Sequence, residues 1–244
     1  MNKLISLNVR RPIIVTALAL ALVACGNDDN DPVNMVEPEP TPEPTPVTYS
    51  YEVTIQNLTN AQPVSPVAVV LHNEGTLWEV GAAASTALEL MAEGGDNSEL
   101  LALANVLSSA SGSAPIGPGA SESITVSIDD NAESKLSVAT MLVNTNDAFT
   151  GWSSLDLSAM AVGDSWTGMG KVYDAGTEMN SEAMGTMPGP ADGGEGYNVM
   201  RDDVDFVSGH PGVVGMEDGL TASVLTQAHR FDNPAIKITV MRTQ

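Results

Sequence analysis

Short segments in which apolar and polar residues alternate constrain the fold of this chain more than any other feature. The clearest run from Tyr49 to Ile55, from Ser121 to Ile128 and from Ala235 to Val240. Successive side chains of a β-strand point to opposite faces of a sheet, so this alternation predicts strands with one buried face. The sequence therefore predicts an all-β domain.

Further segments extend the predicted sheet. Val67 to Leu71 is a continuous apolar run, which is typical of a strand buried on both faces. Lys135 to Val143 and Lys171 to Tyr173 are also strand-like. The last strand is expected to pair with the first and close a sheet. About seven to nine short strands without an internal repeat indicate a single antiparallel β-sandwich.

One stretch, Ser85 to Leu107, is predicted to be helical. Polar residues are followed three positions later by an acid at Thr86–Glu89 and at Asp96–Glu99, which is the spacing of helix N-terminal caps. The pair Gly94-Gly95 separates the two pieces. We expect a short helical insertion that packs against the sheet and contributes to the core.

The N-terminus has the pattern of an export signal. Basic residues precede an apolar run from Pro12 to Ala24, which is too short to span a bilayer. The sequence Leu22-Val-Ala-Cys25 resembles the lipobox of bacterial lipoproteins, in which the cysteine becomes the lipidated mature N-terminus. We therefore expect residues 1–24 to be a signal peptide and Cys25 to be lipidated. The alternative is an ordinary signal peptide with a chance cysteine.

Residues 25–47 are expected to form an acidic, proline-rich tether between the lipid and a domain at 48–244. The segment contains the repeat-like stretch EPEPTPEPTP, which favours an extended path. Gly26, not Asp, follows Cys25. By resemblance to lipoprotein sorting signals, this favours the outer membrane of the bacterial cell envelope, on its periplasmic or surface face.

The chain is strongly acidic, with a formal net charge of −22 and a single cysteine. An acidic surface without a basic patch repels the phosphate backbone, so nucleic-acid binding is excluded. One cysteine allows no intramolecular disulfide, so an exported domain must rely on its core and on any bound metal. The expected contact with a membrane is through the lipid anchor.

Carboxylates follow two of the predicted strands. One strand leads into Asn144, Asn146 and Asp147, and another leads through Tyr173 into the sequence Asp174-Ala-Gly-Thr-Glu178. Acids on loops at strand ends indicate a site for a hard cation, which prefers oxygen ligands. The residues alone leave a second interpretation open, a solvated acidic turn pair at the edge of a sandwich.

Several stretches together resemble the spondin domain, the N-terminal-type domain of F-spondin and mindin, and most of all its bacterial lipoprotein members. They lie between Tyr49 and Val240 and read YEVTIQNLT, VVLHNEG, LSVATMLVNTNDAF, SLDL, YDAGTE, HPG at 210–212, and NPAIKITV. The combination of YDAGTE with the TND turn and SLDL is more specific than any one piece.

The resemblance implies an antiparallel β-sandwich with one bound calcium ion, held by Asp147, Asp174 and Glu178. Glu178 stands where the family has an aspartate, and Asn146-Asp147-Ala148 replaces a Pro-Asp-Trp sequence. The cysteines of the animal domain and its following thrombospondin-type repeats do not appear in this sequence. We therefore expect adhesion or protein interaction with an unknown protein or extracellular-matrix partner, without the specific roles of the animal proteins.

No catalytic motif stands out. The sequence has no HExxH and no GxSxG pattern, and its three histidines lack the spacing of a zinc site. Few aromatic residues are present to build a sugar-binding cleft. We expect no catalytic residues and no enzyme activity. Two alternatives remain: a periplasmic hydrolase that uses the 185–219 loop, and a structural envelope lipoprotein without a ligand.

Overall fold

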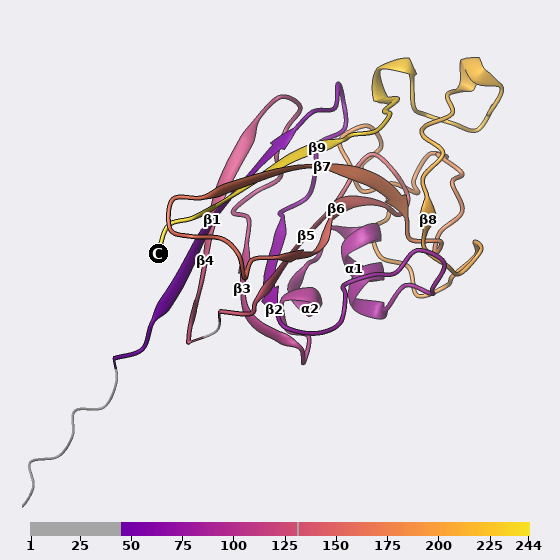
Figure 1. Ribbon diagram of the computed structural model, residues 1–244. Coiled ribbons are helices and arrows are strands. Elements are labelled where there is room, and N and C mark those ends of the chain that lie inside the picture. Colours follow the sequence, from indigo (N-terminus) through magenta and orange to yellow (C-terminus); the bar gives the residue numbers. More distant parts are fainter. Residues whose placement is uncertain (1–44, 131) are drawn as a thin grey trace, which may run out of the picture. The chain divides into compact units, whose positions relative to one another are not determined.

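The computed structural model describes residues 45–130 and 132–244 (Figure 1). The predicted signal segment 1–24, the lipidation site Cys25 and the tether as far as residue 44 lie outside these described residues. Among the helices that are described, none has both the length and the apolar character of a membrane span.

The strands of the described residues form one antiparallel sheet in the order β3-β2-β5-β6-β7-β9-β1-β4, with β8 paired to β7 off this path. Their bounds are β1 (Thr48–Asn57), β2 (Ala68–His72), β3 (Val106–Ser111), β4 (Ser121–Asp129), β5 (Lys135–Met141), β6 (Ala148–Asp156), β7 (Ser165–Asp174), β8 (Ser208–Gly209) and β9 (Ile236–Arg242).

Strand β7 belongs to both layers of the fold, and this turns the sheet into a sandwich. Its first part, Ser165 to Gly170, pairs with β9, whereas Lys171 to Asp174 pairs with β6. The two edge strands also approach each other, because the hydroxyl of Ser108 in β3 donates to the carbonyl of Ser127 in β4 at 2.7 Å. The predicted antiparallel β-sandwich is confirmed (Figure 1).

The main core lies between the two layers. Strand β1 pairs with β9, so that Val53 faces Val240 and Ile55 faces Ile238, and all four side chains are fully buried. The predicted pairing of the first and last strands is thereby confirmed. Every residue of β2 is buried, as its continuous apolar run predicts.

Two short helices cover the outer face of β2, β5 and β6. Helix α1 (Thr86–Gly94) begins where the hydroxyl of Ser85 accepts the N–H of Leu88 at 3.2 Å, and it ends at Gly95, whose φ is 72°. Helix α2 (Ser98–Leu101) is a single turn. Two 3₁₀ turns, η1 (Met216–Asp218) and η2 (Gln227–His229), lie in the C-terminal loops.

The expectation of a helix as far as Leu107 is wrong. The chain leaves the helix after Leu101 and enters strand β3 at Val106, inside the stretch that the sequence predicts to be helical. Residues Ser108 to Ser111 pair with β2 along its open edge. Backbone pairing with a distant strand outweighs the local helical pattern, which is a weak preference by comparison.

Candidate metal centre

The two acid-bearing loops lie side by side. Ala148, the first residue of β6, pairs with Asp174, the last residue of β7. The N–H of Ala175 donates to the carbonyl of Asp147 at 3.3 Å. The two acid-bearing loops that the sequence places after predicted strands therefore lie next to each other.

Asp147 is fully buried, yet only one of its carboxylate oxygens is hydrogen-bonded. Its Oδ2 accepts from the N–H of Thr177 at 2.8 Å, from the Thr177 hydroxyl at 3.2 Å and from the N–H of Glu178 at 3.1 Å. Its Oδ1 is buried and has no hydrogen-bond partner among the described residues. Burial raises the pKa of Asp147 to about 7, and the charge of Asp174 adds to this effect.

Asp174 has both of its oxygens engaged. Oδ1 accepts from the N–H of Gly176 at 2.8 Å, and Oδ2 accepts from the side-chain amide of Asn180 at 2.6 Å. These bonds close the loop from 174 to 180 on itself. Asp174 therefore shapes the loop in which Glu178 lies, and Asp147 presents the freer carboxylate.

His210 completes this hydrogen-bonded chain. Its Nδ1 accepts from the N–H of Gly212 at 2.9 Å, so its Nε2 carries the proton and donates to Oδ1 of Asn180 at 3.0 Å. Burial lowers the pKa of His210 to about 4, although the charge of Asp174 opposes the shift. The ring is neutral with both nitrogens engaged, which is the arrangement of a structural histidine.

Gly176 permits the tight turn between Asp174 and Glu178. Its φ is 72°, a conformation that side chains with a Cβ rarely adopt. A Cβ at this position would lie 2.3 Å from the carbonyl oxygen of Phe206. The loop therefore packs directly against the backbone near Phe206, which holds the N–H groups of Thr177 and Glu178 toward Asp147.

Glu178 is partly buried and surrounded by other acids. Its Oε2 is buried and has no hydrogen-bond partner in the part of the chain that the structure describes. Burial, together with the smaller effects of the charges of Glu93, Asp147, Asp202 and Glu195, raises the pKa of Glu178 to about 8. A carboxylate in such surroundings favours either a proton or a cation beside it.

Glu93 of α1 joins this group, and sequence reasoning missed it. Its side chain is fully buried, and its Oε2 accepts from the N–H of Asn198 at 2.8 Å, whereas Oε1 has no partner among residues 45–130 and 132–244. Burial raises its pKa. The available signal was the presence of Glu89 and Glu93, one turn apart, on the same apolar face as Leu88 and Ala92.

A small cavity of about 150 Å³ opens beside these acids. Its wall includes Asn146, Glu178, Glu195, Asn198 and Asp202. As the side chains stand, no three His, Cys, Asp or Glu residues of the described ranges are grouped so that they could hold a metal ion. The unpartnered oxygens therefore form no coordination shell in the described part of the chain.

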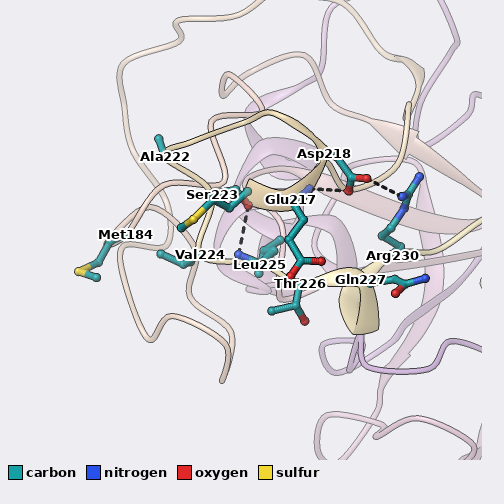
Figure 2. Close-up of a pocket in the computed structure, with 12 residues that line it drawn as sticks. Met184, Glu217, Asp218, Ala222, Ser223, Val224, Leu225, Thr226, Gln227 and Arg230 are labelled. Carbon is teal, nitrogen blue, oxygen red and sulfur yellow. Dashed lines mark hydrogen bonds and ion pairs between the residues drawn. The ribbon is translucent and has the colours of Figure 1, made fainter.

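A larger pocket, of about 640 Å³, lies between η1, η2 and Met184 (Figure 2). Glu217 points across it toward Thr226, and Asp218 is neutralised by Arg230 at 3.1 Å. None of the residues that line this pocket is a histidine. The pocket thus lacks the paired histidine and carboxylate that the hydrolase alternative requires, and it takes in only part of the 185–219 loop.

No protein-family model matches this chain, and no curated protein matches its sequence. The resemblance to the spondin domain accordingly stays a prediction that rests on the stretches quoted above.

Proposed function

We propose that this chain is an envelope lipoprotein of the spondin type, anchored through Cys25, whose β-sandwich binds one calcium ion and supports adhesion or protein interaction. The observation that carries the proposal is the fully buried carboxylate of Asp147. One carboxylate oxygen of Asp147 has no hydrogen-bond partner among the described residues. One carboxylate oxygen of the neighbouring Glu178 has none among them either.

A cation explains this arrangement in physical terms. A buried carboxylate oxygen without a partner costs on the order of 1–3 kcal/mol or more, and neighbouring like charges add to the cost. A divalent ion removes both penalties at once. The donors at this place are oxygens, and the nearby His210 has both ring nitrogens occupied, so the donor set suits calcium better than zinc.

The three predicted ligands take different roles in this proposal. Asp147 and Glu178 contact the ion with their free oxygens, because Oδ1 and Oε2 respectively have no partner in the described part of the chain. Asp174 orients the loop through Gly176 and Asn180, since both of its oxygens already accept hydrogen bonds. Calcium binding here requires Oδ1 of Asp147 and Oε2 of Glu178 to face the same ion.

The role in adhesion or interaction follows from the combination of features. A lipid at Cys25 and an extended tether would hold a rigid sandwich away from the outer membrane. An ion between two loops stiffens a surface, and loops on a rigid scaffold are the usual place for recognition. No partner is identified by the residues of the site.

Calcium titration of the chelator-treated protein by calorimetry tests the proposal. We expect heat of binding with a stoichiometry of one ion and little response to an equal concentration of magnesium, which requires a more rigid octahedral shell. Asp147→Asn should remove the binding heat. Asp129→Asn, at an exposed acid of β4, serves as the control and should bind as the wild type. No heat with the wild-type protein would refute the calcium site.

A further inference from the structure

A pocket of about 330 Å³ opens where strands β6 and β7 separate. β6 pairs with β7 only as far as Gly151, which lies opposite Lys171, and the preceding part of β7 pairs with β9 instead. Residues of both strands and Trp78 line the hollow beside this separation. Its volume lies at the lower end of the range of about 300–1,000 Å³ for ligand pockets, which suits a ligand of one ring.

Aromatic rings gather at this pocket, although the sequence contains few of them. The chain has three Trp, four Tyr and three Phe, and five of these ten rings lie in the pocket wall or against it. The ring centroids of Trp78 and Tyr173 are 5.6 Å apart, with 56° between the planes, and Phe149 packs against both. Trp152 packs against Trp166 at 4.7 Å. The wall therefore offers a fixed aromatic surface for the C–H groups of a ligand ring.

A bulge in β6 brings Ser153 to the pocket. The register of β5 and β6 shifts so that Ser153 and Ser154 together oppose a single residue of β5. The φ of Ser154 is 59°, a strained value for a residue with a Cβ, and such strain is frequent beside ligands. Oγ of Ser153 is buried and has no hydrogen-bond partner among the described residues. A hydroxyl group of a bound ligand would supply the missing bond.

Two ammonium groups give this side of the sheet a local positive charge. Lys171 lines the pocket, and Lys237 of β9 lies opposite Met169, another residue of the pocket wall. Within the described ranges, neither lysine forms an ion pair. The net charge of the chain is −22, but salt screens charges beyond about 8 Å, so the nearest groups dominate. The pocket therefore favours a ligand that carries a carboxylate.

We propose that this pocket binds a carboxylated sugar ring, such as a uronic acid residue of a polysaccharide. The aromatic rings contact the C–H groups of the sugar, Ser153 forms a hydrogen bond with a sugar hydroxyl, and Lys171 pairs with the carboxylate. A neutral sugar lacks the partner for Lys171, and a flat aromatic acid lacks the hydroxyl for Ser153. The sugar site does not depend on the calcium site, and it gives the proposed adhesion a class of ligand.

Titration of the purified full chain with methyl β-D-glucuronide tests the proposal. All three tryptophans of the chain line the pocket or pack against its wall, so we expect a saturable change in tryptophan fluorescence. Saturation-transfer difference NMR then compares the Kd values of three ligands. Methyl β-D-glucoside has the same ring without the carboxylate, and benzoate has a carboxylate on a flat ring without hydroxyls. Each should bind at least about 10-fold more weakly than the glucuronide.

Three variants assign the contacts to side chains. Lys171→Met keeps the apolar stem and should raise the Kd for the glucuronide by about 10-fold or more, with the Kd for the glucoside unchanged. Ser153→Ala should raise the Kd for both sugars by about 3- to 10-fold. It should not lower the Tm, because the hydroxyl has no partner within the described residues. Lys135→Met, at a lysine of β5 outside the pocket wall, is the matched control and should bind as the wild type.

The outcomes keep this proposal separate from the calcium site. If the wild type does not bind the glucuronide, either with calcium or with chelator, the sugar site is refuted and the calcium titration is unaffected. Equal binding of benzoate would overturn the assignment to a sugar, and equal binding of the glucoside would overturn the role of the carboxylate. An unchanged Kd for the glucuronide in Lys171→Met would also overturn that role. Should Lys171→Met fail to fold, Lys171→Gln provides the same comparison.

Discussion

The backbone N–H of Glu178 donates a 3.1 Å hydrogen bond to Oδ2 of Asp147, so two acids with an unpartnered oxygen each are joined through the main chain. Oδ1 of Asp147 and Oε2 of Glu178 have no hydrogen-bond partner among the residues that the structure describes. The bond places the side chain of Glu178 next to the buried carboxylate of Asp147. The proposed cation between them would be supported by a backbone arrangement that is already formed.

This relationship predicts a calcium-dependent melting temperature that Asp147→Asn abolishes. At calcium concentrations about 100-fold above Kd, binding to the folded state adds about 2.7 kcal/mol of stability, which corresponds to a rise of roughly 5 °C or more in Tm. Differential scanning fluorimetry with calcium and with chelator measures the shift. Asp174→Asn should retain part of it, because Asp174 acts through the loop. Equal loss in both variants would contradict the division of roles between Asp147 and Asp174.

Arg201 is expected to be far more important for stability than Arg230. Arg201 neutralises the buried Glu89 and also binds the carbonyl of Ala84, so Arg201→Met leaves a buried charge without its partner and should cost about 3 kcal/mol. Arg230 pairs with Asp218 at the surface, and Arg230→Met should cost less than about 1 kcal/mol. Chemical denaturation of both variants provides the comparison. Similar losses would show that the Arg201–Glu89 pair is not buried in solution.

Gly176→Ala should be strongly destabilising because of a steric contact. The new Cβ would lie 2.3 Å from the carbonyl oxygen of Phe206, in a residue whose φ is 72°. We expect a loss of at least about 3 kcal/mol and weaker calcium binding. Gly185→Ala is the matched control, because its φ is also positive but no atom of the described residues lies within 4 Å of the added Cβ. That variant should cost about 1 kcal/mol, and equal losses would argue against the contact with Phe206.

The free energy of unfolding is expected to fall with decreasing pH because of the titration of His210. Its pKa of about 4 in the folded state lies below its ordinary value of 6.5. Between these two pH values, His210 binds a proton in the unfolded chain but not in the folded protein. The contribution of the neutral ring to the free energy of unfolding is therefore complete above pH 6.5, and it is lost as the pH falls toward 4. From pH 7.5 to pH 5 this amounts to about 2 kcal/mol.

Denaturant titrations at these two pH values check the effect. His210→Gln removes the titrating group. From pH 7.5 to pH 5, the unfolding free energy of this variant should therefore fall by about 2 kcal/mol less than that of the wild type. His229→Gln, at a partly exposed histidine of η2, should follow the wild type. Parallel pH profiles for the wild type and His210→Gln would show that the ring is not buried in its neutral form.

The sequence by itself determined several of the strands and placed an acid loop after two of them. Alternation along Ser121–Asp129 and Ile236–Arg242 is a local signal, because a strand with one buried face must repeat every two residues. Asp147, directly before β6, and Asp174, the last residue of β7, come together because these two strands pair. These features depend on residue order and on the geometry of a single strand pair.

Only the tertiary structure decided which carboxylates remain unsatisfied and which elements enclose them. Strand β3 replaces the predicted helix because β2 presents an open edge to it. Glu93 receives one hydrogen bond from Asn198, a residue 105 positions away, and its charge lies near Glu178. Hydrogen-bond satisfaction of a buried group is set by distant neighbours rather than by adjacent residues, so no local pattern distinguishes Glu93 from the ion-paired Glu89.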